Sequence, residues 1–159
     1  MFREILELIL ITFLPFLELR ASIPYGILKL DMFWPTVFII CVITNILLGI
    51  LIYFLLDRVV HYFLRIRWIR RIYKRIVERT QHRIEKYVDK YGEIGVALFI
   101  GVPLPGSGVY SGALGAYIIG LDFKKFIIAC IVGVILAGVA VTLITLFGSG
   151  AWHFFIKSM

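Results

Sequence analysis

Two opposite charges lie in the middle of an apolar run near the start of the chain. The run FLPFLELRASIP, residues 13–24, places Glu18 and Arg20 two positions apart, between Pro15 and Pro24. An ionised side chain at the centre of a bilayer costs about 2.5–3.5 kcal/mol on insertion scales, so two unpaired charges would cost about 5–7 kcal/mol. One interpretation is an ion pair that holds a turn of the chain together. The pair forms either between these two residues or between two helical hairpins. The other is a charged site at the base of a water-accessible cavity.

Under the second interpretation the two charges have separate tasks. Glu18 carries a proton or holds a cationic group, and the planar guanidinium of Arg20 suits a phosphate. A second polar run, PLPGSGVYSG at residues 103–112, adds hydroxyls and glycines whose backbone N–H groups attract anions. The candidate substrate- or ion-binding residues are therefore Glu18, Arg20, Asn45, Ser107, Tyr110 and Ser111.

The composition predicts a protein of the lipid bilayer. Of its 159 residues 61% are hydrophobic and the mean hydropathy is +0.97, whereas soluble domains are about half apolar. That length gives one membrane domain with a few spanning helices, too small to enclose a wide aqueous path alone, so we expect a homodimer. The net charge of +7 comes from Lys and Arg between apolar spans, which indicates anionic lipid headgroups as partners and no nucleic acid.

The first half of the chain predicts a broken helix followed by a continuous one. Residues 2–30 are long enough to span but are interrupted at Pro15 and Pro24, which favours a re-entrant hairpin. Residues 33–56 carry no charge and predict a transmembrane helix. On this helix Cys41, Asn45 and Gly49 recur at every fourth position and form a narrow stripe that lets another helix approach closely.

The second half repeats that order. Residues 92–120 predict a second re-entrant hairpin, and residues 123–148 predict a second transmembrane helix. On that helix the small residues Ala129, Gly133 and Ala137 repeat the spacing of four. Since each half holds one complete crossing, the second copy is inverted in the bilayer. The predicted fold is thus all-α and integral to the membrane, an inverted repeat of re-entrant hairpin plus transmembrane helix within one domain, residues 1–159. The residues predicted to form the two hairpin elbows are Pro15, Pro24, Pro103, Pro105, Gly106 and Gly108.

The segment between the halves, residues 58–91, is basic. Eleven Lys and Arg residues alternate with apolar residues at spacings of three and four, which predicts an amphipathic helix on the membrane surface. This helix either fixes the orientation of the protein in the membrane or binds anionic lipid headgroups specifically at residues 58–90. The positive-inside rule places it in the cytoplasm, with both termini outside, in a plasma or inner membrane.

The sequence gives no reason to expect an enzyme, a metal or a cofactor. Cys41 and Cys130 lie in apolar runs without ligand spacing, and the three histidines are scattered. The sequence shows no Ser/His/Asp arrangement typical of a catalytic triad. The glycine-rich run lacks the Lys-Ser/Thr ending of a phosphate-binding loop.

Two motifs together resemble the small multi-drug export family, which itself looks like a distant branch of the DedA/VTT superfamily. They are ELRASIPYG at residues 18–26 and PLPGSGVYSGALGA at residues 103–116. The resemblance implies two re-entrant hairpins in inverted repeat, a role in transport and, for the wider superfamily, translocation of lipids such as polyprenyl phosphate. Glu18 and Arg20 match the charged elbow of the family, and the run from Pro103 to Gly108 matches its Pro/Gly elbow.

Two functions follow as hypotheses. The first is a transporter that moves an amphipathic small molecule or a polyprenyl-phosphate-like lipid through a site formed by the two elbows. The alternative is a membrane scaffold or lipid-organising protein that transports nothing and acts through its basic helix. A scaffold gives no reason to place charge inside the bilayer.

Overall fold

The computed structural model describes residues 2–15, 17–63, 91–103 and 106–157, and all regular structure within them is helical. The helices are α1 (Phe2–Phe13), α2 (Glu18–Leu28), α3 (Trp34–Phe63), an unlabelled helix (Tyr91–Gly101), α6 (Val109–Ile119) and α7 (Phe123–Lys157). The all-α prediction is confirmed for these residues. Most of the predicted basic helix, residues 64–90, lies outside them.

Two of the helices are long and apolar enough to cross a membrane. Trp34–Val59 within α3 and Phe123–Gly148 within α7 each have 26 residues, or about 39 Å of helix against a hydrocarbon core of about 30 Å. Only 28% and 44% of their most apolar windows are buried inside the chain, so most of this surface faces outward. The core helix of a soluble protein would be covered by its neighbours, and we therefore treat the chain as a membrane protein.

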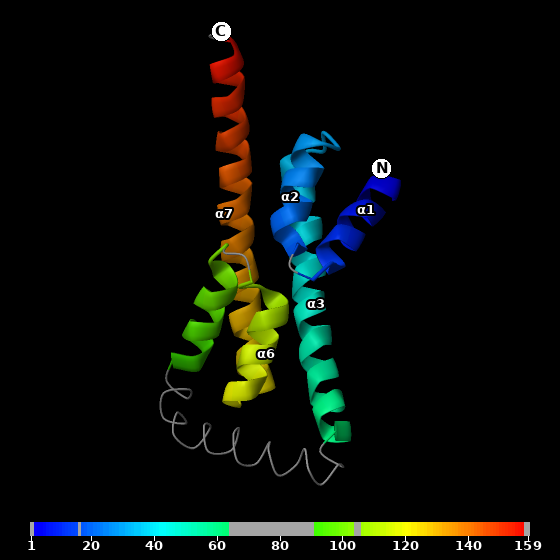
Figure 1. Ribbon diagram of the computed structural model, residues 1–159, viewed down its shortest axis with the longest axis vertical. Coiled ribbons are helices and arrows are strands. Elements are labelled where there is room, and N and C mark those ends of the chain that lie inside the picture. Colours follow the sequence, from blue (N-terminus) through cyan, green and yellow to red (C-terminus); the bar gives the residue numbers. More distant parts are fainter. Residues whose placement is uncertain (1, 16, 64–90, 104–105, 158–159) are drawn as a thin grey trace.

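The short helices form two hairpins that approach each other from opposite ends of the molecule (Figure 1). α1 and α2 lie beside the first part of α3, and the helix Tyr91–Gly101 and α6 lie at the other end. The starts of α2 and α6 come together at mid-height, and the N-terminus and the end of α7 lie toward the same end. Each half of the chain therefore has the order short helix, short helix, long helix.

Small residues on the long helices let the hairpins pack closely, as their spacing predicts. A Cβ atom on Gly49 would lie 2.7 Å from the Cys130 sulfur and from a methyl group of Val109. A Cβ on Gly133 would lie 2.7 Å from the backbone oxygen of Ala97. α3 thus touches α6 and α7 at a position where no side chain fits, and α7 touches the helix Tyr91–Gly101 in the same way.

The first elbow differs from its prediction at one proline. α1 ends at Phe13 and α2 begins at Glu18, so the chain does turn at Pro15. Pro24 was predicted to break the helix as well, and this is wrong, because Pro24 lies inside α2. Proline removes one intrahelical hydrogen bond, but Ile23 and Gly26 on either side are buried, and their packing keeps the backbone helical.

The close contact at Gly133 predicts a loss of stability when a methyl group is added. We expect Gly133→Ala to lower the free energy of unfolding in detergent by about 1–3 kcal/mol, because the new Cβ meets backbone that cannot rotate away. Gly115→Ala in α6 is the matched control, since a Cβ there has no described neighbour within 4 Å. Alanine favours a helix over glycine by about 1 kcal/mol, so this control should be neutral or stabilising. Equal stabilities for the two variants would contradict the packing.

Candidate functional site

The carboxylate of Glu18 bonds the start of α6 across the gap between the two elbows. Its Oε2 accepts the backbone N–H of Val109 at 3.0 Å and its Oε1 accepts that of Tyr110 at 3.3 Å. The first N–H groups of a helix have no partner within the helix and carry partial positive charge, so a carboxylate suits them. The Glu18 residue is only 4% exposed. A buried charge from the first hairpin therefore caps a helix of the second.

One residue on each side of this contact has an unusual feature. Glu18 has a φ of +46°, in the left-handed region that non-glycine residues seldom adopt. Gly108 has an extended backbone, with a φ of −165°, that any residue can adopt. The glycine is needed for a different reason: a Cβ on it would lie 2.6 Å from both carboxylate oxygens of Glu18.

Arg20 bonds the same elbow from the other side. Its guanidinium donates to the backbone oxygen of Val102 at 3.2 Å and to the Ser107 hydroxyl at 3.1 Å. Ser107 in turn donates to the oxygen of Val102 at 2.7 Å. Arg20 and Ser107 together satisfy a carbonyl that the end of the helix Tyr91–Gly101 leaves free.

The remaining predicted hydroxyls satisfy backbone groups of the elbows. The Tyr110 hydroxyl donates to the backbone oxygen of Phe13 at 2.6 Å, which ties α6 to the end of α1. The Ser111 hydroxyl donates to the oxygen of Gly106 at 2.7 Å and accepts the N–H of Gly108 at 3.0 Å. Backbone that leaves its helix is thus bonded by side chains from both elbows.

We call these contacts the elbow interlock: Glu18 to Val109 and Tyr110, Arg20 to Val102 and Ser107, and Tyr110 to Phe13. Both charged side chains bond the opposite elbow, but these bonds go to neutral backbone and hydroxyl groups, whereas the first interpretation predicted an ion pair. The interlock borders a cavity of only about 60 Å³, room for water but far below the roughly 300–1,000 Å³ of small-molecule sites. Its lining contains Pro15, Glu18, Arg20, Gly106, Ser107, Gly108, Tyr110 and Ser111.

The structure brings together eight of the twelve predicted site and elbow residues. Asn45 is 1% exposed on α3, and its side-chain oxygen has no hydrogen-bond partner among the described residues, but it is not in the described lining of the cavity. Pro24 lies within α2, Pro103 follows the helix Tyr91–Gly101, and Pro105 lies outside the described residues.

The sequence did not reveal that backbone groups would be the partners. Val102, Val109 and Phe13 contribute only a carbonyl or an N–H, and these groups exist at nearly every position. The one available signal is the glycine directly before α6, because a helix start without a Cβ leaves room for a ligand or side chain at its N–H groups.

The interlock predicts that the charge of Glu18 stabilises the fold. Glu18→Gln replaces one accepting oxygen by an NH₂ group that faces a backbone N–H. Hydrogen bonds to charged groups contribute about 1.5–3 kcal/mol, and we expect a loss of that size in the free energy of unfolding.

Glu7→Gln in α1 is the control for this substitution. Glu7 bonds Arg3 at 3.2 Å and Tyr25 at 3.3 Å, but its side chain is 33% exposed, and exposed pairs contribute about 0–1 kcal/mol. An equal loss in both variants would contradict a special role for the Glu18 contact.

Comparison with known proteins supports the resemblance carried by the two motifs. No curated protein and no solved structure matches the chain. A family model described as "Putative small multi-drug export protein" matches residues 18–140. The match begins at Glu18, the first residue of α2, includes Arg20 and the second elbow, and extends well into α7, so it covers more than half of the chain. The chain belongs to the small multi-drug export protein family.

Proposed function

We propose that this protein exports amphipathic solutes across the membrane along a path that the elbow interlock closes. The observation that carries the proposal is the pair of charges, Glu18 and Arg20, that bind the opposite hairpin. Membership of an export family supports it. The chain offers no described group of metal-ligating side chains, and the proposal needs none.

In this proposal α3 and α7 cross the bilayer and the two hairpins are re-entrant. α1 has 12 residues and α2 and α6 have 11 each, lengths of about 16–18 Å that reach only halfway through a hydrocarbon core of about 30 Å. Non-helical backbone at that depth needs cover by protein. Tyr110 and Arg20 supply this cover by bonding the carbonyls of Phe13 and Val102.

The chemistry of the interlock favours a gate over a permanent fastening. Apolar residues of similar volume often hold two elements together as well as a buried charge does, so stability alone gives little reason to bury charges here. Hydrogen bonds of charged groups can be exchanged for bonds to water or to a solute. The cavity of about 60 Å³ admits no drug-sized solute, so the hairpins must separate for one to pass.

The two halves would then move as an inverted repeat, with one rocking against the other. We place the basic segment, residues 58–91, in the cytoplasm and both termini outside, because this arrangement satisfies the positive-inside rule. In the same proposal, anionic headgroups contact residues 58–90 and a homodimer seals the outward faces of the hairpins.

A polyprenyl-phosphate-like lipid is the second candidate solute. The N-terminus of α6 already holds one anion, the Glu18 carboxylate, and Arg20 lies against the same elbow. A lipid phosphate that displaced the carboxylate would find the same N–H donors. This candidate requires the solute to reach mid-depth before the elbows separate.

The gate is tested by transport in vesicles that contain the purified protein. Under an imposed ion gradient, we expect the wild type to accumulate ethidium, an anionic amphipathic dye, or both. Arg20→Ala removes two of the hydrogen bonds between the elbows, so less free energy is needed to separate them. Each 1.4 kcal/mol removed from this barrier corresponds to a factor of ten in the rate of opening. Accumulation should therefore fall at least about tenfold, while passive leak of the same dye without a gradient should rise.

Lys29→Ala removes an exposed cation at the other end of α2 and is the matched control. It should accumulate dye like the wild type. Wild-type accumulation by Arg20→Ala would contradict the gate. Charge reversal between Arg65 and Arg83 tests the scaffold alternative: if only this change matters and no dye is moved, the protein organises lipid and does not export.

A further inference from the structure

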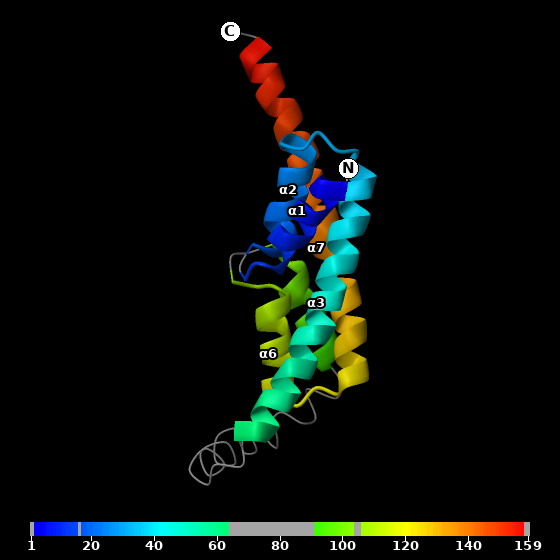
Figure 2. The ribbon, with the colours of Figure 1, turned by 90° about the vertical axis from the view of Figure 1, so that its right-hand side faces the viewer.

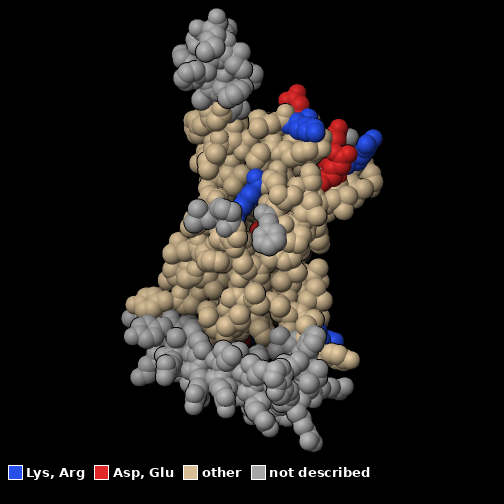
Figure 3. Space-filling model, viewed as in Figure 1, with Lys and Arg blue, Asp and Glu red and all other residues tan. Residues whose placement is uncertain are grey.

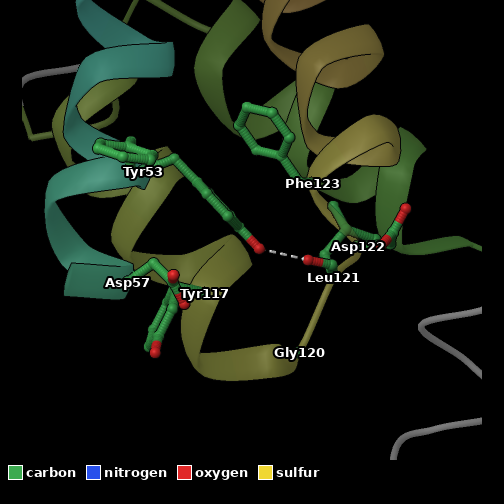
Figure 4. A pocket seen from close by; sticks show the side chains of 8 residues that line it. Tyr53, Asp57, Tyr117, Gly120, Leu121, Asp122 and Phe123 are labelled. Carbon is green, nitrogen blue, oxygen red and sulfur yellow. Dashed lines mark hydrogen bonds between the residues drawn. The ribbon is translucent and has the colours of Figure 1, made fainter. Parts of the chain in front are cut away.

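A second and much larger cavity lies at the other end of α6. It has a volume of about 600 Å³, within the range of sites for drug-sized ligands, and it forms where α3, the end of α6 and the start of α7 meet (Figure 4). Its described lining consists of Tyr53, Phe54, Asp57, Tyr117, Gly120, Leu121, Asp122 and Phe123. None of these residues belongs to the elbow interlock, and the role of the cavity is not explained by the gate.

One wall of the cavity is a fixed group of aromatic rings around Tyr53. The Tyr53 ring stacks on Phe126 with centroids 4.7 Å apart and meets the rings of Phe123 and Tyr117 at 5.4 Å and 5.8 Å. Its hydroxyl donates to the backbone oxygen of Leu121 at 2.6 Å, the bond drawn in Figure 4. The rings are therefore held in place before any ligand arrives. Aromatic faces of this kind bind flat apolar bodies and cations.

The charged groups of the described lining are all negative. Asp57 comes from α3 and Asp122 from the residue before α7, and no described lining residue is Lys or Arg. α6 also ends here, at Gly120 with a φ of +76°, and the carbonyl end of a helix attracts positive charge. In the same region, the ring of Phe54 already holds a cation, since the Arg58 guanidinium lies 5.0 Å from its centroid.

The position of the cavity suits a ligand that is partly apolar. Tyr53 and Phe54 lie within the apolar part of α3, whereas Asp57 is the first charge after it. In the space-filling view, the body between the two ends of the molecule carries few charged side chains (Figure 3). A ligand in this cavity would place its apolar part beside the rings and its charge beside the carboxylates.

We propose that this cavity binds an organic cation with an aromatic or bulky apolar body. The inference rests on the proposed export function, because it names the chemical class of the solute that is loaded before the elbows open. The rings of Tyr53 and Tyr117 contact the body of the solute, and Asp57 and Asp122 face its positive charge. The lipid phosphate considered above has the opposite charge, so the two solutes are separable by experiment.

Binding of tetraphenylphosphonium to the purified full chain tests the site. Tetraphenylborate has nearly the same size and shape and the opposite charge, so it reports on partition into the detergent micelle. By equilibrium dialysis we expect saturable binding of tetraphenylphosphonium at one site per chain and none of tetraphenylborate. Equal binding of the two ions would overturn the proposal.

Substitutions in the cavity locate the binding. Asp57→Asn, Asp122→Asn and Tyr117→Leu should each weaken the binding of tetraphenylphosphonium about tenfold, and Tyr117→Phe, which keeps the ring, should not. Asp31→Asn is the control at the other end of α3, where the residue is exposed and its φ of +50° suits asparagine. Wild-type affinity in Asp57→Asn and in Tyr117→Leu would overturn the proposal, and the elution profile in gel filtration identifies any variant that does not fold.

The same vesicles separate this inference from the export function. If tetraphenylphosphonium binds in the cavity and no dye is transported, the cation site stands and export fails. If the anionic dye alone is transported and tetraphenylphosphonium does not bind, export stands and the cation site fails.

Discussion

The bond between the Glu18 carboxylate and the start of α6 is the contact on which the rest of the arrangement depends. It joins two hairpins whose helices, at 11 or 12 residues where their bounds are described, are too short to cross a bilayer. Each hairpin leaves carbonyl and N–H groups free at its turn, and in the proposed re-entrant arrangement lipid would offer them no partner. The opposite hairpin supplies the partners through Glu18, Arg20 and Tyr110. Neither turn is complete without the other.

The two candidate sites differ in the way that their proposed tasks require. The elbow interlock borders a cavity of only about 60 Å³, whereas the cavity beside Tyr53 is about 600 Å³ and lined by rings and carboxylates. α6 belongs to both, since Val109 receives Glu18 at its first residue and Tyr117 lines the cavity two turns later. A movement of this short helix would change both sites together. Export by the proposed route needs such a link between loading a solute and opening the elbows.

Much of the fold was accessible from local features of the sequence. Length and apolarity predicted the two long helices, Pro15 predicted the first turn, and small residues such as Gly49 predicted close packing, because each of these depends on the residue and its neighbours alone. Pro24 was misassigned for the opposite reason. Its local preference is to interrupt a helix, and the burial of Ile23 and Gly26 outweighs that preference.

The bonding partners of Glu18 and Arg20 could not be predicted from the sequence. By itself it determined that two charges lie in an apolar segment and must be bonded by something, since unpaired charge is costly in lipid. The sequence left open whether they bond each other, the other hairpin or a solute. Only the tertiary structure decided that their bonds include groups 82 to 92 residues away, several of them backbone atoms without any side-chain signature. Such partners arise from the packing of one hairpin on another, and that packing places a helix start where a carboxylate can reach it.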